Sequence, residues 1–149
     1  MDIVFHPIGL VRNSHPQGQK PPTWRGVRSR IELDPRWTPA LNGLDDFSHL
    51  VVLCYLHLAP PDAPPTLIHP QRNAALPLLG FWSTRTPHRP NPIALTVVRL
   101  SKIENNILSV QDLDMFDGTP VLDIKPYLPP PDGTDQITLP QWVFDLRRG

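Results

Sequence analysis

Proline limits the regular structure that this chain can form, because it occupies 21 of the 149 positions, whereas average usage is about 5%. A proline inside a helix removes a hydrogen bond and its ring collides with the preceding turn, so helices of ordinary length fit only into proline-free windows. The long windows are residues 40–59 and 93–119, and shorter ones lie at 23–34 and at the C-terminus. Since 40% of the residues are hydrophobic, the apolar content is that of a globular domain. The prolines therefore indicate frequent turns within a folded domain.

The window 93–119 predicts a β-hairpin. Apolar residues alternate over 93–98, the turn-like Glu104-Asn-Asn106 follows, and residues 107–115 are again rich in strand formers. A short helical turn is expected around residues 41–47. Loops dense in Pro, Gly and Asp separate the other predicted strands, which cover residues 7–12, 28–33, 50–57, 121–124 and 142–146.

Short strands joined by turns, without alternating helices of about ten residues, predict the fold class. We expect a mostly β chain that folds as a single domain, a small antiparallel β-barrel with few short helical turns. The proline-rich stretch 59–65 is too short for a domain linker and predicts a stiff surface loop. Among the eight glycines there is no Gly-x-Gly-x-x-Gly sequence, so a nucleotide cofactor would not lie on a Rossmann turn.

The single cysteine, Cys54, lies in the apolar run 50–56 and is interpreted as a small core residue. It cannot form an internal disulfide, which favours a reducing compartment. No stretch approaches the roughly 18 to 20 apolar residues of a membrane span, and the N-terminus lacks the features of a signal peptide. We therefore expect a cytoplasmic protein that does not associate with a membrane.

Charge is balanced overall and uneven along the chain. The 14 basic and 14 acidic residues give a formal net charge of zero, which excludes the cationic field of a nonspecific nucleic-acid coat and requires any polyanion site to be local. Residues 72–102 contain five basic and no acidic residues, whereas residues 104–149 contain eight acidic and three basic ones. Eleven of the cations are arginine, whose planar guanidinium can bind a carboxylate or phosphate through two hydrogen bonds.

The segment 80–92 is predicted to be a preorganised ligand-binding loop. Its prolines at 87, 90 and 92 fix their own φ angles and restrict the residues before them, so little conformational entropy remains to be lost on binding. Although an arbitrary arginine is more often a solvated surface residue, Arg85 and Arg89 are expected to bind a polar ligand for this reason. A second polar cluster covers residues 114–127, and on spacing alone its Asp117-Gly118-Thr119 is interpreted as a turn.

Other chemistries are less well supported. The six histidines show no His-x-x-x-His spacing and the chain has no Cys-x-x-Cys pair, so no metal site is expected. No Gly-x-Ser-x-Gly sequence supports a hydrolase. His49 and His57 lie at the two ends of the predicted buried strand and, taken alone, are interpreted as core-edge histidines.

Four blocks in order span most of the chain: Ile8-Gly-Leu-Val-Arg12, Gly43-Leu-Asp-Asp-Phe-Ser-His-Leu50, Thr84-Arg-Thr-Pro-His-Arg-Pro-Asn-Pro-Ile93 and Asp114-Met-Phe-Asp-Gly-Thr-Pro-Val-Leu-Asp-Ile-Lys-Pro-Tyr127. In these blocks the sequence resembles the TsaA-like family, which includes the TrmO-type tRNA methyltransferases. The resemblance implies one such domain over residues 1–149, without the additional C-terminal domain of some bacterial relatives. It also implies a β-barrel that binds S-adenosylmethionine without a Rossmann fold, often as a homodimer.

The resemblance implies a cofactor site and weakens the interpretation of 117–119 as a mere turn. An acid or backbone carbonyls can hold the methionine ammonium group, Arg85 can hold its carboxylate, and Leu58 and Leu95 can border the adenine. The family's cofactor-binding positions fall here on Thr23, Trp24, Arg25, His57, Leu58, Arg85, Leu95, Asp117, Gly118 and Thr119.

In characterised members of the family the activity is methylation of N6 of the threonylcarbamoyl-modified adenosine next to the tRNA anticodon. An exocyclic adenine nitrogen is a poor nucleophile, so a hydrogen-bond acceptor for its N–H would assist, and Asn91 and Asp114 are the catalytic candidates. On the tRNA side, Trp82, His88 and Arg89 are the substrate-binding candidates, since unstacked bases stack on aromatic rings and phosphates pair with cations.

Two alternatives remain open from the sequence. The same type of methyltransferase can act on another RNA or on a small molecule, and substrate affinity with a weak salt dependence would favour the small molecule. A non-catalytic module can keep the cofactor pocket without turnover, and it would bind S-adenosylmethionine without releasing S-adenosylhomocysteine.

Overall fold

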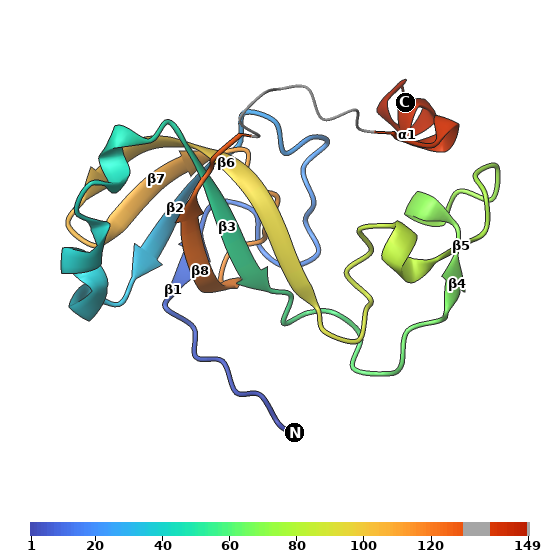
Figure 1. Cartoon of the computed structure of the whole chain (residues 1–149), viewed down its shortest axis with the longest axis horizontal. Helices are drawn as coiled ribbons and strands as arrows, with labels where there is room; N and C mark the ends of the chain where they lie inside the picture. Colours follow the sequence, from blue (N-terminus) through green and yellow to red (C-terminus); the bar gives the residue numbers. More distant parts are fainter. Residues whose placement is uncertain (130–137, 149) are drawn as a thin grey trace. The chain divides into compact units, whose positions relative to one another are not determined.

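The structure is a computed structural model that describes residues 1–129 and 138–148 (Figure 1). Its strands are β1 (Gly9–Arg12), β2 (Arg28–Leu33), β3 (His49–Tyr55), β4 (Leu67–Ile68), β5 (Leu79–Gly80), β6 (Ile93–Glu104), β7 (Ile107–Gln111) and β8 (Pro120–Pro126). Short 3-10 helical turns are η1 (Pro35–Leu41), η2 (Leu44–Asp46), η3 (Pro70–Arg72) and η4 (Phe81–Ser83), and the α-helix is α1 (Gln141–Arg148).

Six strands form a closed antiparallel barrel in the order β1-β2-β7-β6-β3-β8, with β8 returning to β1 (Figure 1). The predicted hairpin is present, since β6 and β7 are joined at Asn105, whose φ of 54° lies in the left-handed region. Strand β3 lies between β6 and β8 and pairs with β6 from His49↔Arg99 to Tyr55↔Ile93. The expected mostly β fold, a small antiparallel barrel with few short helical turns, is confirmed.

The barrel core follows from a period of two along the strands. In β2 the side chains of Ser29, Ile31 and Leu33 are buried while those of Arg28 and Arg30 are exposed. Each fully buried aliphatic side chain contributes roughly 1.5–3 kcal/mol to folding relative to an exposed one. The buried apolar residues that pack into this one core are Val11, Ile31, Leu33, Leu50, Val52, Cys54, Val98, Leu108, Val110, Leu113, Met115 and Val121.

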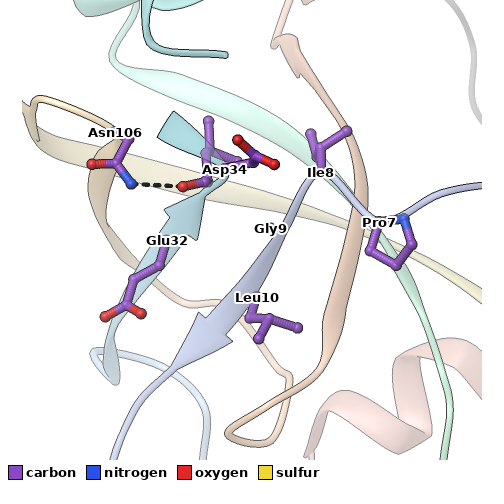
Figure 2. A pocket seen from close by; sticks show the side chains of 8 residues that line it. Pro7, Ile8, Gly9, Leu10, Glu32, Asp34 and Asn106 are labelled. Carbon is purple, nitrogen blue, oxygen red and sulfur yellow. Dashed lines mark hydrogen bonds between the residues drawn. The ribbon is translucent and has the colours of Figure 1, made fainter. Parts of the chain in front are cut away.

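Strands β1 and β2 approach each other closely at Gly9. A Cβ atom at Gly9 would collide with the Glu32 carbonyl oxygen and the Leu33 Cα, so only glycine fits there. A surface pocket of about 360 Å³ lies beside this contact (Figure 2). In it the Asn106 side-chain amide donates a hydrogen bond to the Leu33 carbonyl oxygen at 2.6 Å.

The chain divides into two compact units. The barrel unit comprises Met1–Leu58 and Pro92–Tyr127, and the second unit comprises Ala59–Asn91 and Leu128–Gly149. The second unit contains the two-stranded sheet of β4 and β5, the turns η3 and η4, and α1. Among the described residues, no helix combines the length and the apolar character needed to cross a bilayer.

The strand predicted for residues 142–146 is wrong, because this segment lies within α1. Its run of Trp, Val, Phe and Leu resembles a strand in composition, yet Trp142, Val143 and Leu146 are the half-buried residues and have the spacing of a helix face. Pro140 directly precedes the first helical residue, a place where its missing N–H costs nothing. The helical turn expected around 41–47 is present as η2, together with the end of η1.

Candidate functional site

A turn before β8 forms the centre of the candidate site in the barrel unit. Gly118 has a φ of 80°, a left-handed conformation that favours glycine, and its N–H donates to the Val11 carbonyl at 2.8 Å. Asp117 has three partners: its N–H donates to the His15 carbonyl at 2.8 Å, its Oδ1 accepts from the Asn13 N–H at 3.0 Å, and its Oδ2 lies 3.9 Å from the Arg12 guanidinium. The predicted turn at 117–119 is therefore fixed to the segment that follows β1.

Thr119 completes this turn from the inside. Its side chain is buried, and its hydroxyl donates to the Phe116 carbonyl at 2.8 Å. Asn13 ties the two segments further, since its side-chain amide donates to the Ser29 hydroxyl at 3.0 Å and to the Met115 carbonyl at 2.9 Å. These bonds hold the backbone groups of the turn in one arrangement.

The segment 23–26 joins the same cluster through Trp24. The Trp24 ring packs edge-on against His15 and Phe116, with ring centroids 5.5 Å and 5.7 Å apart. Arg25 is exposed, and its N–H donates to the Thr23 hydroxyl at 3.1 Å. Contacts of Trp24 and Asn13 thus bring together three segments that are far apart in sequence, 13–15, 23–26 and 115–119. The cofactor-binding roles of Thr23, Trp24, Arg25, Asp117, Gly118 and Thr119 remain predictions.

His57 follows β3 and carries an unsatisfied buried nitrogen. Its Nε2 lies 3.3 Å from the Gln17 side-chain nitrogen, which links His57 to the loop that contains Asn13 and His15. Its Nδ1 is buried and has no hydrogen-bond partner among the described residues. Because a buried polar atom without a partner costs free energy, this nitrogen is suited to a hydrogen bond with a bound polar molecule.

Two of the predicted cofactor-binding residues are exposed leucines. Leu58 follows His57 and is 44% exposed, and Leu95 on β6 is 52% exposed and pairs with Leu53 of β3. An apolar side chain left half in water can cover a flat apolar ligand at little conformational cost. The apolar border predicted for an adenine therefore has the required accessibility at both positions.

Asp114, one of the two catalytic candidates, is an exposed carboxylate at an end of the barrel. Its Oδ1 accepts a hydrogen bond from the Thr96 hydroxyl at 2.5 Å. Burial raises the pKa of the Cys54 thiol from its ordinary value of 9.0 to about 12, and the negative charge of Asp114 contributes to the rise. The hydrogen bond from Thr96, a residue of β6, holds the Asp114 carboxylate in place. Its second oxygen, Oδ2, has no hydrogen-bond partner among the described residues and can accept a further hydrogen bond.

The remaining site predictions lie in the second unit, in the loop 80–92. His88 Nε2 lies 2.9 Å from the Asp62 carbonyl oxygen and 3.8 Å from its carboxylate. The Arg89 guanidinium donates to the Thr84 carbonyl at 3.4 Å, and the Thr84 hydroxyl donates to the Phe81 carbonyl at 2.8 Å. Side-chain to backbone hydrogen bonds thus connect Arg89 with Thr84 and Thr84 with Phe81 within the loop. The preorganisation expected from its prolines remains a prediction.

Three of the predicted site residues in this loop are exposed. Trp82 is 80% exposed and meets Phe81 edge-on with ring centroids 4.8 Å apart. Arg85 and Asn91 are exposed. Their availability for a ligand is as predicted, and their roles remain predictions.

The pocket of Figure 2 contains none of the predicted site residues. It is lined by the β1–β2 edge and by the acidic side chains of Glu32 and Asp34. Glu32 already pairs with Arg12 at 3.3 Å and Arg30 at 3.7 Å. Asp34 likewise pairs with Arg36 at 3.3 Å. Both carboxylates of this pocket therefore already have basic partners.

Sequence reasoning missed Asn13, His15, Gln17 and Phe116, which hold the predicted residues in place. Three of these lie in the loop 13–20, which has no periodic pattern and no chemical motif of its own. Asn13 bonds Asp117 and Gln17 bonds His57 across 104 and 40 positions of sequence. Shorter contacts join Asn13 to Ser29, 16 positions away, and His15 to Trp24. Only the barrel register brings them together, so nothing local in the sequence identifies them.

The family model for the tRNA-methyltransferase O N-terminal domain matches residues 12–133. A probable S-adenosyl-L-methionine-binding protein of Pyrococcus abyssi is 32% identical over 141 residues, which cover 92% of this chain and 74% of that protein. A putative S-adenosylmethionine-dependent methyltransferase of Pseudomonas aeruginosa is 39% identical over 149 residues, covering 96% of this chain and 61% of that protein.

A human tRNA (adenine(37)-N6)-methyltransferase is 38% identical over 122 residues, which cover 81% of this chain and 27% of that protein. Among solved structures, TrmO from Pseudomonas aeruginosa matches with a TM-score of 0.73 and 33% identity, over 95% of this chain and 62% of that one. The chain therefore spans less than two thirds of the Pseudomonas and human proteins and most of the archaeal one.

Proposed function

The chain belongs to the family of the tRNA-methyltransferase O N-terminal domain, and on that premise we propose that it binds S-adenosylmethionine and methylates tRNA. The position we assign is N6 of the adenosine next to the anticodon, in its threonylcarbamoyl-modified form. One observation carries the proposal: the matched span, residues 12–133, includes every predicted site residue. The names of the relatives support both the cofactor and the substrate.

For the cofactor we assign two groups of residues. In the barrel unit, the buried Nδ1 of His57 offers a hydrogen bond, Leu58 and Leu95 offer apolar cover, and Asp117 offers a carboxylate for an ammonium group. In the second unit, the exposed Arg85 offers a guanidinium for a carboxylate. Taken one by one, each of these groups has the chemistry that one part of S-adenosylmethionine requires: its ammonium group, its carboxylate or its apolar adenine. The assignment also includes Thr23, Trp24, Arg25, Gly118 and Thr119.

The bound cofactor supplies a methyl group already activated by its sulfonium. What the chain contributes is alignment, because holding two reactants in line can lower a barrier by about 7–11 kcal/mol. The N6 atom forms a bond to the methyl carbon, the carbon–sulfur bond breaks with its electrons on sulfur, and the N6 proton is released. We assign Asp114 and Asn91 as acceptors for that N–H, an effect worth about 10²–10⁴-fold in rate.

For the tRNA we assign the exposed Trp82 to stacking with an unstacked base, and His88 and Arg89 to contacts with the substrate. The single buried cysteine, which has no disulfide partner, and an RNA substrate support a cytoplasmic location.

We also propose that the chain forms a homodimer. Strands β3 and β6 present an outward apolar face, since Val51 pairs with Val97 and Leu53 with Leu95. Tyr55 at the end of β3 is 45% exposed and Val97 is 41% exposed. Contiguous exposed apolar side chains on a barrel wall are typical of an interface between subunits.

A calorimetric titration with S-adenosylmethionine tests the cofactor, with the wild type and Arg85→Ala measured in parallel. We expect saturable binding that weakens in the variant, because the carboxylate loses its guanidinium partner. The titrated protein is then incubated with tRNA that lacks the methyl mark, and S-adenosylhomocysteine and the methylated nucleoside are quantified.

The two readouts separate the alternatives. Binding without S-adenosylhomocysteine under any RNA would mean a non-catalytic module. Turnover on a small molecule, with affinity independent of salt, would contradict the tRNA substrate. The absence of binding in a folded wild-type sample would contradict the cofactor itself.

A further inference from the structure

Four polar side chains form a row across the outside of the barrel. The strand register places Arg28 of β2 opposite Gln111 of β7, Gln111 opposite Arg99 of β6, and Arg99 opposite His49 of β3. Neighbouring strands lie about 4.8 Å apart, so the row spans roughly 14 Å from Arg28 to His49.

All four side chains point outward. In each strand the adjacent residue on the inner side, Ser29, Val110, Val98 or Leu50, is buried. Arg28, Arg99 and His49 are exposed and Gln111 is half-buried. The row thus presents two guanidinium groups, an imidazole and an amide to the solvent, with no apolar or acidic side chain between them.

The two arginines of the row differ from the other strand cations of the barrel in lacking an acidic partner. Arg12 and Arg30 pair with Glu32, Lys102 pairs with Glu104, and Lys125 pairs with Asp123. Within residues 1–129 and 138–148, no carboxylate lies within 4.0 Å of the Arg28 or Arg99 guanidinium. The nearest acid in sequence, Asp112, follows Gln111 and accepts a hydrogen bond from the Gly26 N–H. Among the described residues, the guanidinium groups of Arg28 and Arg99 therefore form no ion pair and can each bind an anion.

The position of the row relates it to the candidate site. Arg28 begins β2 directly after the loop that carries Trp24, and Gln111 ends β7 directly before the segment that leads to Asp114. On β6, Arg99 lies four residues beyond Leu95 on the same outward side, which is about 13 Å along a strand. At the far end of the row, the Tyr127 N–H donates to the His49 carbonyl at 3.0 Å, and the Tyr127 side chain is 40% exposed.

We propose that this row, Arg28, Gln111, Arg99 and His49, binds successive phosphates of the RNA substrate, with Tyr127 available to stack on a base at its end. The inference rests on the proposed function for the identity of that RNA. Arginine guanidinium groups without acidic partners suit phosphate oxygens. A row of two arginines, an amide and an imidazole that ends at an aromatic ring suits a single strand or loop of RNA. The chain thereby has a local polyanion surface in spite of its zero net charge.

The test is the salt dependence of RNA binding. The dissociation constant of an unmethylated tRNA is measured by fluorescence anisotropy between 50 and 200 mM salt, for the wild type and for Arg28→Ala/Arg99→Ala. Each lost phosphate contact reduces the slope of log K against log salt by about 0.7 for single-stranded RNA, so we expect the double variant to lose about 1.4. The Arg28→Lys/Arg99→Lys variant keeps the charge and should keep most of the slope.

Arg36→Ala, combined with Lys125→Ala, is the charge-matched control, because Lys125 also has an acidic partner, Asp123, at 2.7 Å. Arg36 pairs with Asp34 at 3.3 Å and lies over the Trp37 ring at 4.9 Å, so the loss of these two cations should leave the slope unchanged. The affinity of the double variant for S-adenosylmethionine is measured on the same sample and should equal that of the wild type, which shows that the barrel is folded.

The outcomes distinguish this inference from the proposed function. The inference is wrong if the double variant has the salt slope and the RNA affinity of the wild type. It is also wrong if the control loses as much of the slope as the double variant. If the wild type binds tRNA with the expected slope and transfers no methyl group, the row stands and the proposed function fails. A wild type that binds no RNA overturns both.

Discussion

At the scale of single residues, the unsatisfied nitrogen of His57 links stability to binding. A buried polar atom without a partner costs about 1–3 kcal/mol, and the Nδ1 of His57 is such an atom among the described residues. A hydrogen bond between this nitrogen and a bound ligand would recover that free energy.

We predict that His57→Leu lowers the affinity for S-adenosylmethionine and leaves the stability of the apo protein almost unchanged. The apo protein should keep its free energy of unfolding to within about 1 kcal/mol, because an apolar side chain replaces an unsatisfied one. Affinity for S-adenosylmethionine should fall by roughly 2- to 13-fold, the equivalent of one hydrogen bond of about 0.5–1.5 kcal/mol. Denaturant titration and calorimetry measure the two quantities, with His6→Leu in the exposed N-terminal segment as control. Unchanged affinity would remove His57 from the site.

Gly118 permits a prediction about the backbone. Its φ of 80° is strained for other residues, while the space around a Cβ atom there is open. Gly118→Ala should therefore destabilise the protein by about 1–2 kcal/mol through conformation alone, and Gly118→Asn should lose less because asparagine tolerates this region. Urea unfolding measures both. Equal stability of the wild type and Gly118→Ala would mean that the turn adopts another conformation.

Cys54 predicts a dependence of stability on pH. Since burial and Asp114 raise the pKa of its thiol from 9.0 to about 12, the unfolded state releases the proton above about pH 9 while the folded state keeps it. The folded state then binds more protons, so the free energy of unfolding falls as pH rises from about 9 to about 12, by at most about 1.4 kcal/mol per unit.

Comparison with Cys54→Ala isolates this contribution, because the lysine and tyrosine residues titrate equally in both proteins. Unfolding free energies at pH 8, 9.5 and 10.5 should converge between wild type and variant as the pH increases. A constant difference would show that the thiol ionises normally in the folded protein.

At the scale of secondary-structure elements, the sequence predicts what is encoded locally. Alternation predicts the bounds of β2 correctly, and the Asn-Asn turn predicts the hairpin of β6 and β7. Strands β4 and β5 have two residues each and are too short for any pattern. For α1, strand-like composition conflicted with helical spacing, and the proline before it was the stronger signal.

In the candidate site, too, some features are encoded locally in the sequence and others depend on the tertiary structure. The prolines of the loop 80–92 restrict its backbone, and this restriction can be predicted from the sequence. The cluster of Asn13, His15, Trp24, Phe116 and Asp117 depends on which strands are neighbours in the barrel. The resemblance to a family located Trp24 and Asp117, and no reading of single residues could supply the contacts that hold them.

At the scale of the whole molecule, the apolar face of β3 and β6 predicts an assembly. Val97→Asp should convert a dimer into a monomer, because a carboxylate would be buried at the interface. Sedimentation equilibrium measures the mass. Ser109→Asp adds the same charge to β7, between Arg30 and Lys102, and should remain dimeric. A monomeric wild type, or a dimeric Val97→Asp, would contradict this interface.

The closure of the barrel has a consequence for the order of folding. Strands β1 and β8 join through only two residue pairs, Gly9↔Val121 and Leu10↔Pro120, which are more than 100 positions apart in sequence. A nascent chain cannot make this seam until its last strand has left the ribosome, and pairings of such long range form slowly. Since Asp117 reaches the loop after β1 only across that seam, an unfinished chain lacks the turn that the proposed cofactor site requires.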